Sequence, residues 1–192
     1  SYLRIGGVAQ DVTPDFVHKV REFVDEYPKA VDGYHQLLTD NAIWTRRTKN
    51  VGVLSAEDAI SFGVTGPTLR GSGVACDLRK DAPYSSYDDF DFQIPVGDIG
   101  DAYDRYLVRM EEFTQSTRII AQAIENLPQG PIQTDNPLVA MPDLQAVQKD
   151  AGALIRRFKI GSDGPVLPHG ENYCAVEGAK GELGFYLVGN GT

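Results

Sequence analysis

The feature that most constrains the fold is a long amphipathic stretch between Gly100 and Leu127. Apolar side chains recur there at steps of three and four residues, which is the spacing of one face of an α-helix. The stretch predicts about 27 helical residues, or roughly 40 Å of helix. The run LPQGP at residues 127–131 contains two helix-breaking prolines and ends it sharply. A chain organised around such an element is predicted to be mainly helical.

Other segments add shorter elements to this long helix. Thr13 and Pro14 form a helix-start signal, and the helix is predicted to kink or end at Pro28, with the pattern continuing to Leu38. A short capped helix is predicted at residues 55–60, and a further helical stripe at 144–158. Residues 173–188 alternate with a period of two around a Gly-Ala-Lys-Gly turn, which predicts a β-hairpin. The predicted fold class is mainly α with a small β part (α+β).

Residues 63–100 have a different character, because their glycines and prolines leave little room for long helices. A stretch of this length without regular structure is unusual unless it is functional or packed against something. We therefore predict one domain made of a helical segment at 1–62, a wrapping loop at 63–100, a long-helix bundle segment at 101–160 and a β-hairpin region at 161–192. The chain has no initiator Met, begins abruptly within a patterned run and stops just after a strand-like run. We therefore expect a piece of a longer protein, truncated at both ends.

Composition excludes several classes of protein. The 192 residues carry 18 Lys and Arg against 27 Asp and Glu, a formal charge of −9, which argues against a nucleic-acid partner. No apolar stretch approaches the roughly 18 residues needed to span a bilayer. Cys76 and Cys174 lie far apart, and the three histidines form no metal-binding frame, so no metal ligand is expected in this chain.

One short run has two readings. Arg70-Gly71-Ser72-Gly73 resembles half of a glycine-rich loop, but no strand–helix frame surrounds it. It is either a tight turn or a backbone laid closely against a cofactor or neighbour, and spacing alone does not decide between them. Charged residues near 77–80 are expected to pair loops with the long helix, whereas Glu111 and Glu112 are expected on a solvated or interfacial face. No complete catalytic set is visible, so we assign no catalytic residue.

The same run lies inside a longer stretch that is recognisable. Residues 63–80, GVTGPTLRGSGVACDLRK, resemble the signature of the 49 kDa subunit of respiratory complex I, the D subunit of bacterial NADH–quinone oxidoreductase. The resemblance covers essentially the whole chain and is weakest around residues 132–150. The other runs that carry it are RIGGV at 4–8, NAIW at 41–44, YDRYLVR at 103–109, GENY at 170–173 and KGE at 180–182.

The resemblance implies a helix-bundle fold related to the large subunit of nickel–iron hydrogenases. It implies a peripheral subunit that helps to form the quinone-reduction site beside the terminal iron–sulfur cluster and couples electron transfer to proton translocation. Iron–sulfur clusters and FMN would then lie in partner subunits, with none held by this chain alone, and quinone would be the substrate at a shared interface. The expected partners are other complex I subunits, above all the one that carries the terminal cluster, and the membrane arm through them. The expected location is the cytoplasmic face of the bacterial inner membrane, or the matrix side in mitochondria.

The residues that we assign to the site are Arg70, Gly71, Ser72, Gly73 and Lys180, as neighbours of the quinone cavity or the cluster. Lys180 stands where the hydrogenase loop carries an Arg beside its metal, and Ala179 replaces an expected Pro. We also predict that Arg70 and Asp77 face the interior or a subunit interface, and that Arg70 has a partner, because an unpaired buried guanidinium is costly.

Two other functions remain open. One is the large subunit of an energy-converting nickel–iron hydrogenase, whose cysteine pairs would lie outside both ends of this sequence. The other is a scaffold domain that binds neighbours without chemistry of its own. The 192 residues alone are expected to be inactive with NADH or quinone.

Overall fold

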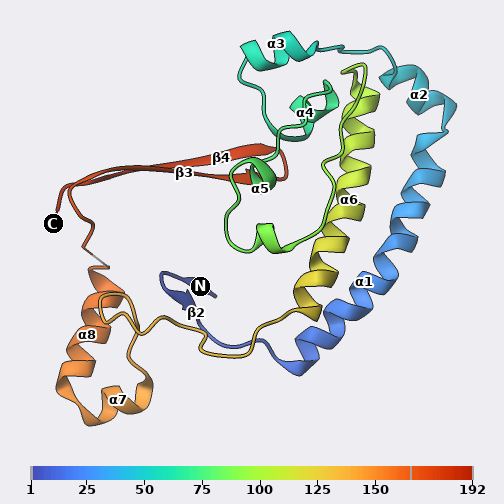
Figure 1. Ribbon diagram of the computed structural model, residues 1–192. Helices are drawn as coiled ribbons and strands as arrows, with labels where there is room; N and C mark the ends of the chain where they lie inside the picture. The colour runs from blue at the N-terminus through green and yellow to red at the C-terminus, as the bar shows by residue number, and fades with distance from the viewer. Residues whose placement is uncertain (1, 165, 192) are drawn as a thin grey trace. The chain divides into compact units, whose positions relative to one another are not determined.

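The computed structural model describes residues 2–164 and 166–191 (Figure 1). Its elements are helices and two two-stranded sheets, in agreement with the predicted α+β class. The chain divides into two compact units: unit 1 comprises Ser1–Pro14, Pro128–Asn172 and Tyr186–Thr192, and unit 2 comprises Asp15–Leu127 and Tyr173–Phe185. The four predicted segments and their grouping into one domain stay a prediction.

Unit 2 is built around one central helix. That helix is α6, Ala102–Glu125, close to the span that the apolar stripe predicts. Asp101 caps it by accepting a hydrogen bond from the Asp104 N–H at 2.8 Å, and the same buried carboxylate accepts one from the Asn50 N–H at 2.7 Å. The other helices of the unit are α1 (Pro14–Tyr34), a π-helix (His35–Thr39), α2 (Ala42–Thr48), α3 (Ala56–Ser61), α4 (Gly66–Gly71) and α5 (Leu78–Asp81), with a short 3₁₀ turn at Tyr87–Asp89.

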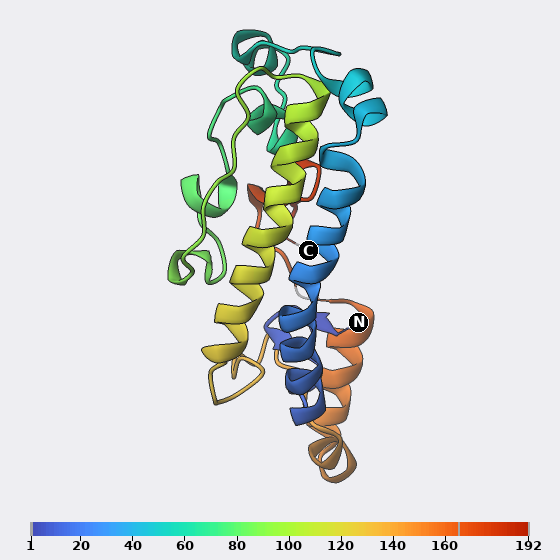
Figure 2. The same cartoon turned by 90° about the vertical axis from the view of Figure 1, so that its right-hand side faces the viewer.

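The helices α1 and α6 run side by side in both ribbon views (Figures 1 and 2). They meet edge to face through Tyr27 and Phe113, whose ring centroids lie 6.0 Å apart. The short helix α2 packs against the start of α6 through Trp44 and Tyr106, 5.4 Å between centroids. Such aromatic pairs add to the free energy of burying each ring, so they hold the long helices in place.

The sequence predicts that Pro28 kinks or ends the first helix; it does not end it, because α1 continues across it to Tyr34. Proline removes one hydrogen bond to the carbonyl four residues earlier. Pro28 lies on the exposed side of α1, where water can satisfy that carbonyl. The short helix predicted at residues 55–60 is confirmed, with Ser55 accepting from the Asp58 N–H.

The glycine-rich segment 63–100 contains no long helix, as predicted, but it does contain α4 and α5. Gly71 shows how closely it lies on α6: a Cβ there would stand 2.8 Å from Cγ of Arg105. Gly97 is as tight, since its Cβ would stand 2.3 Å from the Gly71 carbonyl oxygen. Both readings of residues 70–73 therefore hold in part, because Gly71 lies close against α6 and Gly73 has the positive φ of a tight turn, +86°.

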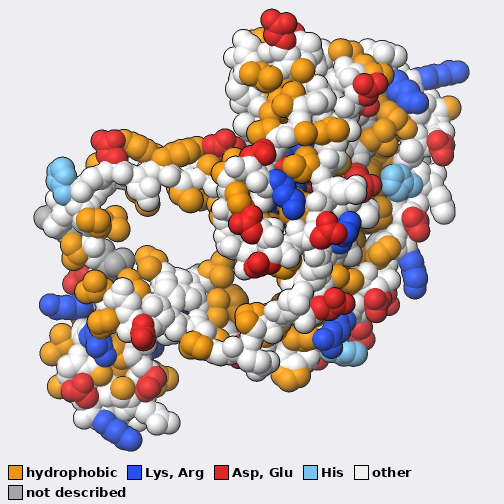
Figure 3. Space-filling view, viewed as in Figure 1, with side chains coloured by type: hydrophobic (Ala, Val, Ile, Leu, Met, Phe, Trp, Pro, Cys, Tyr) orange, Lys and Arg blue, Asp and Glu red, His pale blue; other side chains and the backbone are white. Residues whose placement is uncertain are grey.

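The predicted β-hairpin is confirmed as β3 (Gly170–Gly178) paired with β4 (Gly181–Gly189). Its tip belongs to unit 2 and its open end to unit 1. Large hydrophobic side chains stay exposed along it, as the orange side chains of Figure 3 show. They are Tyr173, Leu183, Phe185, Tyr186, Leu187 and Val188.

Unit 1 contains a small sheet and two helices. The strands β1 (Leu3–Arg4) and β2 (Gly7–Val8) are antiparallel, with Leu3 opposite Val8. The helical stripe predicted at 144–158 forms two helices, α7 (Leu144–Lys149) and α8 (Ala151–Ser162). They separate at Asp150, because its carboxylate caps α8 by accepting from the N–H groups of Gly152 and Ala153.

Candidate functional site

A buried cluster of charged side chains lies at the centre of unit 2. We call it the ion cluster; its members are Arg70, Asp77, Arg79, Glu112 and Glu177. The side chains of Arg70 and Asp77 are 1% and 0% exposed, which confirms the prediction that both face the interior. The five residues come from α4, the start of α5, α6 and β3, so the cluster joins segments that lie far apart in the sequence.

Arg70 is the hub of the ion cluster. Its Nη1 donates to Glu177 Oε1 at 2.9 Å and to the Cys76 carbonyl at 3.0 Å, and its Nη2 donates to Glu112 Oε1 at 2.9 Å. The prediction that a buried Arg70 has a partner is therefore confirmed. Its Nε has no acceptor among the described residues. Because several acceptors share one planar guanidinium, Arg70 fixes the distance between α6 and the hairpin.

Asp77 and Arg79 form a bidentate pair inside the cluster. Arg79 Nε and Nη2 donate to the two Asp77 oxygens at 2.9 and 2.6 Å, and Nη2 also donates to Glu112 Oε2 at 3.0 Å. Burial raises the pKa of Asp77, but the hydrogen bonds and charge of Arg79 outweigh it and leave the pKa below its ordinary value. Burial likewise lowers the pKa of Arg79, and the bond to Asp77 with the charges of Glu112 and Asp77 reverses that effect. Both groups therefore stay ionised at neutral pH.

The role of Glu112 corrects one expectation from the sequence. Glu112 does not lie on a solvated face of α6, because its side chain is only 15% exposed and receives bonds from both arginines of the cluster. An interfacial position stays a prediction. Glu111, one residue earlier, is exposed as expected. Helix periodicity could not separate the two, since adjacent residues on a helix point about 100° apart and the position of the loop decides which one is covered.

The hairpin tip is held against α4 by two glycines. Gly66 has a φ of +65°, and a Cβ there would stand 2.3 Å from the Gly181 Cα. Thr65 Oγ1 accepts from the Glu182 N–H at 3.0 Å, which fixes the same contact from the side. Tyr84 supports the strand before the tip, because its hydroxyl accepts from the Glu177 N–H at 3.0 Å. These contacts place the tip residues Ala179 and Lys180 beside the ion cluster.

A cavity of about 490 Å³ opens in front of the ion cluster. Ring and aliphatic surfaces line it, from Pro67, Tyr87, Phe113 and Ala179. Charged side chains line it as well, namely Arg70, Arg79, Arg109, Glu112, Glu177 and Lys180. Arg70 and Lys180, two of the predicted site residues, thus line one cavity although 110 positions separate them in the sequence.

The other predicted site residues, Gly71, Ser72 and Gly73, do not line this cavity. Gly71 packs on Arg105, and Ser72 is buried with no partner for its Oγ among the described residues. Gly73 has a φ of +86°, which favours glycine at the end of α4. The structure therefore gives these three residues a part in chain packing, and a direct role at the site stays a prediction. Sequence reasoning did not single out Arg109, Glu112 or Glu177 as site residues.

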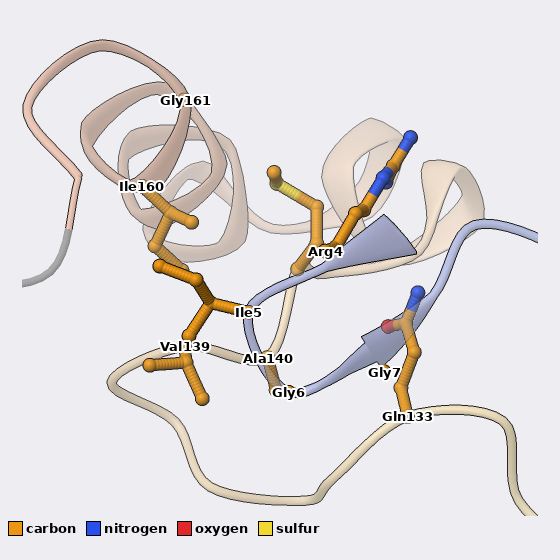
Figure 4. Close-up of a pocket in the computed structure, with 10 residues that line it drawn as sticks. Arg4, Ile5, Gly6, Gly7, Gln133, Val139, Ala140, Ile160 and Gly161 are labelled. Carbon is orange, nitrogen blue, oxygen red and sulfur yellow. The ribbon is translucent and has the colours of Figure 1, made fainter. Parts of the chain in front are cut away.

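A second cavity, of about 390 Å³, lies in unit 1 (Figure 4). Arg4 and Ile5 of the β1–β2 turn region line it together with Val139 and Ile160. None of the predicted site residues belongs to it. We assign it no function.

The described residues contain no group of three or more His, Cys, Asp or Glu side chains that could hold a metal ion. No helix within the described ranges is long and apolar enough to cross a membrane. Cys76 and Cys174 are both free, with Cys174 exposed and Cys76 partly buried.

The thiol of Cys76 provides a test of the electrostatics beside the ion cluster. Burial raises the pKa of Cys76, and the charge and hydrogen bond of Asp81 raise it further. Because only the thiolate reacts, Asp81→Asn is expected to speed alkylation of Cys76 at neutral pH on the order of a few-fold. Mass spectrometry of iodoacetamide-treated protein in a Cys174→Ser background measures that rate. Asp88→Asn, an exposed acidic residue in the same segment, is the control, and an unchanged rate in Asp81→Asn contradicts the assignment.

Comparison with known proteins gives the same family over the whole chain. The family model described as "Respiratory-chain NADH dehydrogenase, 49 Kd subunit" matches residues 1–192. Similar curated proteins are the D subunits of NADH-quinone oxidoreductase from Trichlorobacter lovleyi, 49% identical over 192 residues, and from Ehrlichia ruminantium, 45% identical over 192 residues. The corresponding protein of Magnetococcus marinus is 49% identical over 191 residues.

All of this chain aligns with each of these proteins, but it covers only 49% of the first two and 48% of the third. The chain thus spans about half the length of the curated relatives that it matches. The residues that form the ion cluster and the hairpin tip all lie within the matched range. By this match, the chain belongs to the family of the 49 kDa subunit of respiratory-chain NADH dehydrogenase.

Proposed function

We propose that this chain forms one wall of the quinone-reduction site in an NADH–quinone oxidoreductase. The observation that carries the proposal is the cavity beside the ion cluster, which combines flat apolar surfaces with fixed charged groups. A quinone head group is a flat ring with two carbonyl oxygens, so a site that binds it needs apolar surface for the ring and polar groups for the oxygens. The relatives' printed name, NADH-quinone oxidoreductase, supports quinone as the substrate class.

The rest of the proposal follows from the family. The full-length protein would lie on the cytoplasmic face of the inner membrane, or on the matrix side in mitochondria, with the subunit of the terminal iron–sulfur cluster as its neighbour. FMN and the iron–sulfur clusters would be held by partner subunits. Quinone reduction at the shared interface would be coupled to proton translocation by the membrane arm. A fold related to the large subunit of nickel–iron hydrogenases is part of the same proposal.

The ion cluster would support this site by holding its wall rigid. Arg70 joins α6 to β3 through Glu112 and Glu177, so the spacing of the cavity walls is set by short bonds between buried groups. A preorganised wall keeps a bound ring in one orientation. The alternatives, a hydrogenase large subunit or a scaffold, predict different results: cysteine pairs in the full-length chain for the first, and no effect of filling the cavity for the second.

Filling the cavity tests the proposal. Ser116 lines the cavity from α6, and Ser116→Leu adds apolar volume without adding charge. In the assembled complex we expect kcat/KM for quinone to fall about tenfold or more, because small displacements of a bound substrate have large effects on rate. NADH oxidation by a water-soluble artificial acceptor should stay unchanged.

The matched control for this variant is Thr114→Leu, an exposed position on the same helix that does not line the cavity. It should leave both rates unchanged, and native gels should show equal amounts of complex for both variants. Wild-type quinone kinetics in a fully assembled Ser116→Leu complex would show that the cavity does not receive quinone.

A further inference from the structure

Two of the cations that line the cavity lack an acidic partner. Arg109 donates through Nη1 to the Arg105 carbonyl at 2.9 Å and forms no ion pair with a described carboxylate. Lys180, at the exposed hairpin tip, forms no salt bridge or hydrogen bond with the described residues either. By contrast, Arg70 and Arg79 are paired with carboxylates on the same wall.

The charge of this wall is therefore uneven. The ion cluster alone holds three carboxylates against two guanidinium groups, so it carries one surplus negative charge. Arg109 and Lys180 reverse the sign, so the ion cluster and these two cations together carry one surplus positive charge. One negative charge on a bound ligand would balance it.

Arg70, the buried centre of the ion cluster, also has a hydrogen-bond donor without an acceptor in the part of the chain that the structure describes. Arg70 lines the cavity with a side chain that is 1% exposed, and its Nε has no acceptor among the described residues. A buried donor without an acceptor is costly, so such a group is expected to meet a ligand or an ordered water. The lining of the cavity thus combines a surplus of cations with a buried arginine whose Nε lacks an acceptor among the described residues.

We infer that Arg109 and Lys180 form the anion-receiving side of this cavity, so that it holds a quinone ring with a negatively charged oxygen more tightly than a neutral ring of the same shape. The inference rests on the proposed function and names the charge state that the site favours. A ring oxygen that gains electrons becomes more negative, and cations fixed beside it stabilise that charge more than they stabilise the neutral ring. By this inference, Arg109 and Lys180 both contact the substrate.

A pair of matched probes tests this charge preference. One probe is 2-hydroxy-1,4-naphthoquinone, whose acidic hydroxyl is ionised at neutral pH, and the other is its neutral methyl ether. Their dissociation constants are measured with the assembled complex by equilibrium dialysis without NADH, corrected with protein-free detergent micelles. We expect Arg109→Gln and Lys180→Gln each to weaken binding of the anionic probe about tenfold or more, the range for a charge-assisted hydrogen bond. Binding of the ether should change less than about twofold.

Two kinds of control sharpen the result. Arg109→Lys and Lys180→Arg keep the charge and should retain most of the preference for the anionic probe. Arg118 lies on α6 like Arg109, but it pairs with Asp91 and does not line the cavity. Arg118→Gln should therefore leave the dissociation constants of both probes unchanged.

The outcomes separate this inference from the proposed function. Equal weakening of both probes in Arg109→Gln and Lys180→Gln, or no weakening of the anionic probe, overturns the charge preference. The proposed function fails separately, if Ser116→Leu leaves quinone kinetics and the binding of both probes at their wild-type values.

Discussion

Replacing Arg70 with methionine is expected to destabilise the subunit by about 3–5 kcal/mol, the cost of leaving a buried charge without its partner. Methionine keeps an unbranched apolar stem, but it is shorter than arginine and removes the positive charge between Glu112 and Glu177. Arg79 can still neutralise Glu112. Glu177, with a side chain 6% exposed, would keep a single donor among the residues that the structure describes, the Leu78 N–H at 3.3 Å. The measurements are the amount of assembled complex on native gels and the temperature at which the purified complex inactivates.

Two variants separate this effect from a general loss of charge. Arg118→Met removes an arginine of an exposed ion pair with Asp91, and such pairs contribute less than about 1 kcal/mol. The double variant Arg70→Met with Glu177→Gln removes the stranded carboxylate and should recover part of the stability. If the double variant is no more stable than Arg70→Met alone, the unpaired carboxylate of Glu177 is not the cause of the lost stability.

Replacing Gly66 with alanine is expected to detach the hairpin tip from α4. The new Cβ would stand 2.3 Å from the Gly181 Cα and 2.6 Å from its nitrogen, and backbone atoms cannot turn away as a side chain can. The two segments must therefore separate, which moves Lys180 away from the cavity. We expect a loss of about 2–4 kcal/mol in stability, from overpacking and from a left-handed backbone together, with a marked fall in quinone reduction.

Gly63 offers a matched control, because it has the same φ of +65° but no described residue other than its chain neighbours within 4 Å of an added Cβ. Gly63→Ala should show only the cost of the left-handed backbone, about 1–2 kcal/mol. The difference between the two variants isolates the contact with Gly181. Equal destabilisation in both, measured by thermal inactivation of the complex, would mean that the hairpin tip does not depend on this contact.

The exposed apolar side chains of the hairpin show how far these 192 residues account for their own packing. Leu183, Phe185 and Leu187 on β4 are each at least 50% exposed. A two-stranded sheet is marginally stable by itself in water. Because of this exposure, and because the chain is about half as long as its relatives, the stability of the hairpin is best measured on the full-length subunit in its complex.

The local sequence was sufficient for the elements whose signals are short-range. The stripe of α6, the cap at Ser55 and the alternation of the hairpin each depend on neighbours within a few residues, and each is confirmed. Sequence patterns did not predict that α1 continues through Pro28 or that α7 and α8 separate at Asp150. The effect of a helix breaker or a cap depends on whether water or a side chain completes the local hydrogen bonds.

The sequence by itself also determined the family, through long runs of matching residues, and it predicted that Arg70 and Asp77 face the interior or a subunit interface. Only the tertiary structure decided which carboxylates neutralise that arginine. Glu112 lies 42 positions from Arg70 and Glu177 lies 107 positions away. Nothing local marks them, because the free energy that selects them is the cost of burying charge where α4, α6 and the hairpin meet.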